Sequence, residues 1–306
     1  MPTLCGLDIT LQLDSELWND FVHDLGLTLL CPSFRLKLQR LSLHIQLKEG
    51  ADLPVCDVSD YEALGPEFQG LEFPALRELS LRGFDRWEHL EELTNFRDPW
   101  NLHNCRYPHL RSLALYQFPL ALELLEGLAC PGLLEFRYYM DISVDQVLNG
   151  DFEKHFQTLA SFLRSFDSLV EVEICDTVVG EWLAAGRDVR SNTFPVDVLF
   201  ECHGQLEILR CPALFEWMTM RTPRFRGKYF ARLRSRCPRL RQLLVYAHKP
   251  GFDLSNLLTN LPLRNLEILP LGGMRVPSDT SNTNGYVFHK TPSAELWKVR
   301  WAKTAS

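Results

Sequence analysis

The sequence predicts an α/β protein in which a curved parallel sheet carries helices on its convex side, the architecture of a solenoid. Three observations lead to this fold class. An apolar triplet spaced i, i+3, i+5 recurs along the chain, proline often stands two residues before it, and segments with helical apolar spacing lie between the copies. Strand, turn and helix in alternation favour parallel strands joined by outer helices.

The clearest copy of the triplet is Leu76, Leu79 and Leu81 in the segment FPALRELSLR. Leu79 and Leu81 alternate with polar residues, which is typical of a short strand with one buried face. Nine copies share this spacing, and we expect each to form one strand of the sheet. They begin at Leu4, Leu38, Leu76, Leu110, Leu133, Leu169, Leu206, Leu240 and Leu266.

Proline marks the approach to four of these strands. Phe73-Pro74, Tyr107-Pro108, Cys130-Pro131 and Cys237-Pro238 each place proline two residues before the first leucine of a triplet. Proline has a fixed φ and lacks an N–H, so it separates a helix from the next strand. We interpret the two cysteines as small buried hydrophobic residues at turns, rather than as redox or metal-binding groups.

Helical apolar spacing predicts the elements between the strands. Ser15 is the expected N-cap of a helix that runs through Leu25, and Asp85 that of a helix through Leu93. Residues 151–166 carry a strong helical pattern, residues 194–203 and 254–261 a weaker one, and the connector 119–129 is short and almost wholly apolar.

The triplets predict an array of about nine irregular units over residues 1–271, after which the pattern stops. Residues 272–306 are predicted to form a polar loop and a short C-terminal helix, a cap or tail. The loop is the polar stretch 278–285, and the helix rests on Trp297 and Trp301, which stand four residues apart.

Composition narrows the function. The net charge of −7 over 306 residues argues against general nucleic-acid binding, and no apolar run is long enough to span a membrane. Nine scattered cysteines form no CxxC pair, and none of the eleven asparagines opens a glycosylation sequon. Together these features predict reduced thiols and an intracellular protein, cytoplasmic or nuclear.

The segments FPALRELSLRGF, YPHLRSLALYQF and CPRLRQLLVYA resemble leucine-rich repeats, most closely the long, irregular repeats of fungal F-box/leucine-rich-repeat proteins. The resemblance covers roughly residues 1–271. It implies a substrate receptor of an SCF-type ubiquitin ligase, in which an F-box holds the ligase adaptor and the repeats hold the target. Because the first triplet begins at Leu4, we expect no F-box here, and adaptor binding only where an F-box lies outside or upstream of this chain.

Motifs for catalysis and nucleotide binding are missing: neither GxxxxGK[ST] nor GxGxxG occurs, and HExxH and GxSxG are absent too. Cys202, His203 and Cys211 lack an evident fourth ligand, so they are interpreted as strand-end and loop residues. The sequence therefore predicts no enzyme, no cofactor and no metal site. The alternative is an enzyme with an unrecognised Cys/His site, for which His103 and Cys105 are the candidates.

Residues 221–241 hold nine basic residues and no acidic one, with aromatic residues interleaved. Such a segment can bind an acidic protein or, less favoured here, nucleic acid. In the alternative interpretation, the arginines are solvated or paired with acidic neighbours, and the residues that pack inward are Tyr229, Phe230, Leu233 and Cys237. The candidate basic patch consists of Arg224, Arg226, Lys228, Arg232 and Arg236.

The residues that alternate with the buried ones point out of the predicted sheet on its concave face. Tyrosine and arginine are enriched at binding hot spots. We therefore predict a non-enzymatic scaffold that binds a partner protein on this face, with Tyr116, Arg137 and Tyr139 close together at its centre. The candidate binding residues are His44, Arg82, Tyr116, Arg137, Tyr139 and Tyr246.

Overall fold

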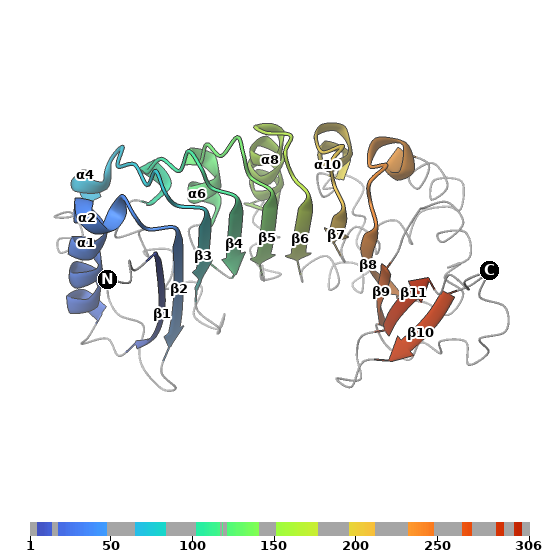
Figure 1. Cartoon of the computed structure of the whole chain (residues 1–306), viewed down its shortest axis with the longest axis horizontal. Coiled ribbons are helices and arrows are strands. Elements are labelled where there is room, and N and C mark those ends of the chain that lie inside the picture. Colours follow the sequence, from blue (N-terminus) through green and yellow to red (C-terminus); the bar gives the residue numbers. More distant parts are fainter. Residues whose placement is uncertain are drawn as a thin grey trace. The chain divides into compact units, whose positions relative to one another are not determined.

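The computed structural model describes residues 5–13, 18–47, 65–83, 102–116, 118, 121–140, 151–176, 196–211, 232–247, 265–270, 286–290 and 297–301. These residues form an α/β protein whose main element is an open parallel sheet, as the sequence predicts (Figure 1). The chain divides into two compact units, one of Met1–Ser143 with Glu153–Phe166 and one of Val144–Phe152 with Asp167–Ser306.

The first unit contains five parallel strands in the order β1-β2-β3-β4-β5, with helices between them. Its strands are β1 (Gly6–Leu13), β2 (Arg40–Leu47), β3 (Glu78–Arg82), β4 (Ser112–Tyr116) and β5 (Glu135–Met140). Its helices are α1 (Trp18–Leu30), α2 (Pro32–Arg35), α4 (Gly65–Phe68), η1 (Leu102–Asn104), α6 (Ala121–Gly127) and most of α8 (Asp151–Arg164).

The predicted triplets form a continuous buried ladder in this unit. Leu41 pairs in register with Leu79, Leu79 with Leu113, and Leu113 with Phe136. A second rung follows two residues later, from Leu43 through Leu81 and Leu115 to Tyr138. Each of these side chains is at most 4% exposed. The predicted period-2 alternation is therefore confirmed in these strands: every second residue along a strand is buried in a core that neighbouring strands share.

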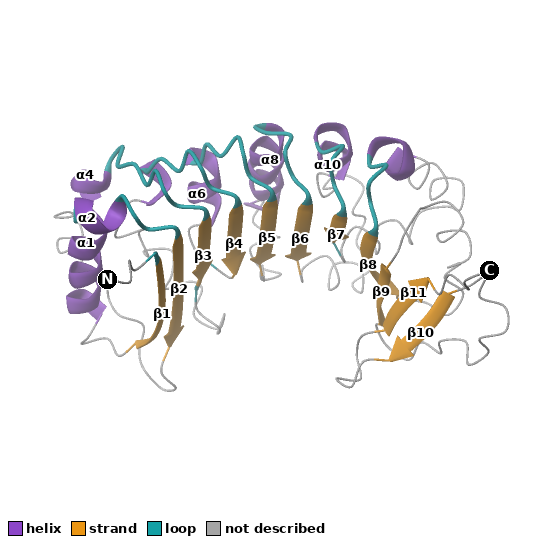
Figure 2. Ribbon diagram, viewed as in Figure 1, coloured by secondary structure: helices purple, strands orange, loops and turns teal. Residues whose placement is uncertain are grey.

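A tight turn precedes five of the described parallel strands, β3, β4, β5, β7 and β8, and so occurs in both units. In the first unit, the N–H of Leu76 donates to the carbonyl of Phe73 at 3.2 Å, and Leu110 and Leu133 make the same bond to Tyr107 and Cys130. These are turns of four residues with proline in the second position, where its fixed φ is favourable. Figure 2 shows them among the teal segments that lead into the strands. The predicted separation of helix from strand by proline is confirmed.

Helix α8 covers the buried side of this sheet. Its ring of Phe162 lies 5.2 Å from that of Phe136 in β5 and 5.0 Å from that of Phe166. Phe156, Leu159 and Leu163 are also buried, in agreement with the helical pattern predicted for 151–166. Helix α1 buries Leu25 and Leu29 in the same way, with the predicted spacing of one apolar face.

The second unit continues the same construction and adds a hairpin. Strands β6 to β9 are parallel and sequential, and β9 then pairs with β11, which pairs with β10; both of these contacts are antiparallel. Helix α10 confirms the helix predicted at 194–203. The elements are β6 (Glu171–Asp176), α10 (Val196–Cys202), β7 (Ile208–Arg210), β8 (Gln242–Ala247), β9 (Asn265–Pro270), β10 (Tyr286–Lys290) and β11 (Trp297–Trp301).

The last predicted triplet, which begins at Leu266, is out of register with the earlier ones by three residues. Leu243 pairs with Leu266, not with Leu269, and Val245 pairs with Ile268. The triplet in register with the earlier ones therefore begins at Leu263. The error arose because the segment LPLRNLEILPL offers several leucines at compatible spacings, and only the pairing with β8 selects among them.

The predicted C-terminal helix at Trp297 and Trp301 is also wrong, because these residues bound strand β11. In the segment WKVRW the apolar residues alternate with charged ones, which is the period of a strand. A spacing of four fits both periods, and pairing with β9 and β10 decides for the strand. The helices predicted at 85–93 and 254–261, the polar loop at 278–285, Ser15 and Leu4 lie outside the described residues.

Candidate functional site

The open face of the first unit consists of the side chains that alternate with its buried ladder. Strand register arranges them in rows that run across the five strands. Among the rows whose side chains are described, we call the one nearest the carboxyl ends of the strands the strand-end row. Its members are Thr10, His44, Arg82, Tyr116 and Tyr139.

Two tyrosines form the centre of this row. The rings of Tyr116 and Tyr139 stack with centroids 4.7 Å apart and planes inclined by 27°. Neighbouring strands lie about 4.8 Å apart, so side chains paired in register meet face to face. Both tyrosines are half-buried. The sequence prediction that they lie close together is confirmed.

Arg82 and His44 extend the row on the other side of Tyr116. Arg82 is exposed and pairs in register with Tyr116, and His44 pairs with Arg82 on the next strand. The row thus contains two potential cations and two aromatic rings in consecutive positions across four strands. Such a combination has the residue types found at binding hot spots.

Arg137 belongs to the neighbouring row, where it faces Ala114 rather than Tyr116. Its guanidinium lies 3.6 Å from the carboxylate of Glu135 on the same strand, and the hydroxyl of Ser112 donates to that carboxylate at 3.2 Å. Arg137 therefore flanks the tyrosine pair diagonally while its charge is partly compensated. At the first strands of the unit, Arg40 makes a similar exposed contact with Asp8 at 3.4 Å.

The open face of the second unit is built around a cluster of charges. Arg210 in β7 contacts Glu171 at 3.0 Å and Glu173 at 3.4 Å, both in β6. All three side chains are at most 23% exposed. Strand alternation in the sequence places these three residues on the open face, but they were not among the predicted binding residues. The signal was the Glu-x-Glu spacing of β6, which places both carboxylates on one face beside a single arginine.

The candidate residue Tyr246 lies in β8, but its side chain is outside the described part of the structure. Within the basic segment, Arg224, Arg226 and Lys228 are outside it too. The described part supports the paired interpretation in two places: Arg232 contacts Glu201 at 2.6 Å, and Arg241 contacts Glu207 at 2.6 Å.

Two of the residues predicted to pack inward in the basic segment do so, whereas Tyr229 and Phe230 lie outside the described residues. Leu233 is 1% exposed and Cys237 is 0% exposed, so both pack inward. Arg236 is exposed on the short helical stretch 232–236. This places a charged helix surface over a buried apolar side, the arrangement that an amphipathic helix produces.

The two cysteines next to proline, Cys130 and Cys237, are buried at the turns that precede β5 and β8. Burial raises the pKa of the Cys130 thiol to about 12 and that of the Cys237 thiol to about 11. A thiol with such a pKa is not a nucleophile at neutral pH. The interpretation of these residues as buried hydrophobic groups at turns is confirmed.

The residues considered for a Cys/His site are only partly described in the structure. The thiol of Cys105 is buried and donates to the carbonyl of Phe68 at 3.5 Å, while the side chain of His103 is outside the described residues. His203 and Cys211 are both buried, and the carbonyl of His203 accepts from the thiol of Cys237 at 3.8 Å. Among the described residues, no group of three or more His, Cys, Asp or Glu side chains could hold a metal ion.

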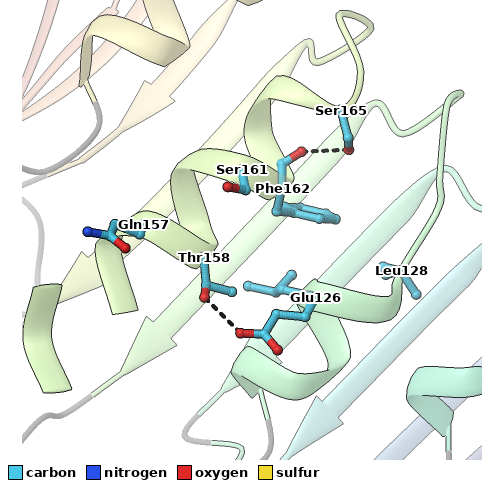
Figure 3. Close-up of a pocket in the computed structure, with 8 residues that line it drawn as sticks. Glu126, Leu128, Gln157, Thr158, Ser161, Phe162 and Ser165 are labelled. Atoms are coloured by element: carbon cyan, nitrogen blue, oxygen red, sulfur yellow. Dashed lines mark hydrogen bonds between the residues drawn. The ribbon is translucent and has the colours of Figure 1, made fainter. Parts of the chain in front are cut away.

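A hollow of about 400 Å³ opens between α6 and α8 on the helix side of the first unit (Figure 3). The hydroxyl of Thr158 donates to the carboxylate of Glu126 at 3.1 Å, and the hydroxyl of Ser165 donates to the carbonyl of Phe162 at 2.7 Å. This hollow could not be predicted from the sequence, because it depends on how two helices distant in sequence pack. The Thr158–Glu126 hydrogen bond joins the two helices across the hollow.

No described helix is long and apolar enough to cross a membrane. Comparisons of the chain with protein families, with curated proteins and with solved structures give no match.

Proposed function

We propose that this chain is a non-enzymatic leucine-rich-repeat solenoid that binds another protein on the open face of its sheet. The observation that carries the proposal is the strand-end row of the first unit, in which Tyr116 and Tyr139 stack beside Arg82. Scattered thiols without CxxC pairs and the lack of glycosylation sequons support an intracellular location, cytoplasmic or nuclear.

The repeat part of the proposal is supported by the recurrence of one structural unit. A four-residue turn closes at Leu76, Leu110, Leu133, Leu206 and Leu240 with bonds of 3.1 to 3.2 Å, and each time a parallel strand follows. Neither face of one such unit can be buried alone, so neighbouring copies must stack. Stacked copies produce a long open face, which is the binding surface that solenoids use.

The partner-binding part is supported by the composition of the row. In the interior of a protein, aromatic rings stack as part of core packing. Here both rings lie on the face opposite the core, so core packing does not account for them. An aromatic pair at a half-exposed position offers a partner a large, rigid contact area at low cost in side-chain entropy.

The test is partner binding by a face variant. Wild-type protein and the variant Tyr116→Ala, Arg137→Ala, Tyr139→Ala are immobilised, and proteins retained from cell lysate are quantified. A partner retained by the wild type is then purified and titrated. We expect the variant to bind about 2 kcal/mol more weakly, or roughly thirtyfold, and to stay folded while melting a few degrees lower, because the stacked rings are lost.

Two further variants locate the site. Gln157→Ala with Ser161→Ala alters exposed residues at the hollow between α6 and α8 and is expected to bind like the wild type. Arg232→Glu with Arg236→Glu alters the basic segment, and it is measured in the same assay at two salt concentrations. Loss of binding in the arginine variant alone would place the partner on the basic segment and contradict the proposal.

A role as substrate receptor of an SCF-type ubiquitin ligase rests on the resemblance of segments such as YPHLRSLALYQF to F-box/leucine-rich-repeat proteins. In that role the open face holds the target and an F-box outside this chain holds the adaptor. This chain by itself is expected not to co-purify with the ligase adaptor. Stable co-purification would show that another surface makes the contact.

A further inference from the structure

We infer that the second unit carries a further binding site, at which exposed arginines near the end of the basic segment bind a run of aspartate or glutamate side chains in a partner protein. We call these arginines the arginine cluster, and its members are Arg234, Arg236 and Arg239. The site is separate from the proposed function, because the partner proposed above binds the open face of the first unit.

The sequence around the arginine cluster carries one sign of charge. Residues 221–241 hold nine basic residues and no acidic one, whereas the rest of the chain holds 23 basic and 39 acidic residues. The stretch 212–231 contains four basic residues and one acidic residue, and the stretch 248–264 also contains a single acidic residue. The chain on either side of the cluster therefore brings few carboxylates that could neutralise it.

Buried side chains fix the backbone beneath the cluster. Leu233, Cys237 and Leu240 are at most 1% exposed. The N–H of Cys237 donates to the carbonyl of Leu233 at 2.8 Å, and the N–H of Leu240 donates to the carbonyl of Cys237 at 3.1 Å. The helical stretch 232–236 and the turn after it thus present the three arginines from an ordered backbone, so that a partner orders little of this chain when it binds.

The arginines at the two ends of the described segment differ from those of the cluster. Arg232 contacts Glu201 at 2.6 Å, and Arg241 contacts Glu207 at 2.6 Å. Within the described part of the chain, the three arginines of the cluster are exposed and make no ion pair. Like charges so close in sequence repel one another, and a run of carboxylates would relieve that repulsion.

Guanidinium groups suit a carboxylate partner. Each presents a planar fork of donors that can hold a carboxylate through two parallel hydrogen bonds. A single exposed ion pair contributes little, up to about fivefold in affinity, because water competes for both charges. Several pairs made by one acidic segment contribute together, since the segment is brought to the surface only once.

The charge of the remaining chain disfavours nucleic acid as the occupant. A nucleic acid carries a charge at every nucleotide and binds along an extended basic track. Outside residues 221–241 the chain has more acidic than basic residues, which repel a long polyanion. A short acidic protein segment ends within the basic segment and avoids this repulsion.

The experiment uses the full chain and three fluorescent probes: a short glutamate peptide, the matching lysine peptide and a long single-stranded oligonucleotide. Fluorescence anisotropy measures each dissociation constant. We expect the glutamate peptide to bind at least about tenfold more tightly than the lysine peptide, and more tightly than the oligonucleotide. Its affinity should fall as salt rises from about 0.1 M to about 1 M, which shortens the Debye length from about 10 Å to about 3 Å.

The decisive variant replaces all three arginines of the cluster with glutamine. The matched control replaces three exposed cations of the first unit, so that the net charge changes equally: Lys37→Gln, Arg77→Gln and Arg106→Gln. We expect the cluster variant to bind the glutamate peptide about tenfold or more weakly, and the control to change its affinity by less than about twofold. Melting temperatures equal to that of the wild type would show that both variants are folded.

Four results would overturn the inference. They are a glutamate peptide that binds no better than the lysine peptide, a long oligonucleotide that binds at least as tightly, a cluster variant that binds like the wild type, and a control that loses as much affinity as the cluster variant. The open-face variant of Tyr116, Arg137 and Tyr139 should bind the glutamate peptide like the wild type, and a loss there would also contradict a separate site. The proposed function is judged by the cellular partner that this open-face variant loses, so either proposal can fail while the other holds.

Discussion

The open faces of the two units are built on the same kind of parallel strands and differ in how their side chains are satisfied. In the first unit an aromatic pair and exposed Arg82 share one row, and the Arg40–Asp8 and Arg137–Glu135 ion pairs lie in the two neighbouring rows. In the second unit Arg210 holds Glu171 and Glu173 in a partly buried cluster. The same strand geometry thus carries different side chains: on the second face Arg210 contacts two carboxylates of the neighbouring strand, and on the first two stacked tyrosine rings lie beside Arg82.

The largest expected effect concerns what the two faces share, the buried ladder beneath them. Leu113→Asp in the first unit and Leu209→Asp in the second each place an unpaired carboxylate at a position that is 0% exposed. We expect each to lower the free energy of unfolding by about 4 kcal/mol, since a buried charge without a partner is among the costliest substitutions. Urea denaturation measures the loss.

The control is Ser80→Asp, which puts the same carboxylate on the open face one residue after buried Leu79. It should cost less than about 1 kcal/mol. A soluble Leu113→Asp variant with an unchanged unfolding midpoint would show that the ladder is not shared as described.

Removing the arginine of an ion pair should lower the free energy of unfolding more on the second face than on the first. Arg210→Ala leaves Glu171 and Glu173 side by side without the guanidinium between them, and we expect a loss of about 2 kcal/mol, less than for a fully buried pair. Arg40→Ala in the first unit removes an ion pair whose partners are 55% and 59% exposed, and should cost less than about 0.5 kcal/mol. Equal losses in denaturant titrations would remove the distinction between the faces.

Alkaline conditions should weaken both units through their buried thiols. Cys130 and Cys237 have pKa values raised from 9.0 to about 12 and about 11. Above pH 9 the unfolded state loses these protons while the folded state keeps them, so stability is complete below pH 9 and falls as the pH rises toward these values. Near pH 10 we expect a loss of about 1.4 kcal/mol for each thiol.

The check is the slope of the unfolding free energy against pH. Cys130→Ala and Cys237→Ala should each flatten that slope between pH 9 and about 10, whatever constant cost the smaller side chain adds. An unchanged slope in one variant would show that its thiol is already accessible in the folded unit.

The smallest expected effect is the coupling of the tyrosine pair. Tyr116→Ala, Tyr139→Ala and the double variant form a thermodynamic cycle, from which we expect a coupling free energy of about 1 kcal/mol for stacked rings. The corresponding cycle for Arg210 and Glu171 should give a larger coupling. If the measured coupling free energy is zero, the stacking of the rings contributes contact area for a partner but no stability.

The ladder of the first unit could be predicted from the sequence, because period-2 alternation and the proline turn are local properties of the chain. Leu79 and Leu81 are buried whichever neighbour they meet, and Pro74 sets the turn before them. The same alternation predicted that Arg82, Tyr116 and Tyr139 lie on the open face. The helical pattern of 151–166 was local too, and α8 follows it.

Tertiary structure decided everything that depends on which strands or helices meet. Leu266 rather than Leu269 faces Leu243, and Trp297–Trp301 is a strand, because pairing with β8 and with β9 and β10 selects between patterns that the sequence satisfies equally. Arg210 reaches Glu171 across 39 residues of sequence. The hollow between α6 and α8 likewise arises from packing. Local periodicity determines which face a side chain takes, and register alone determines its neighbours.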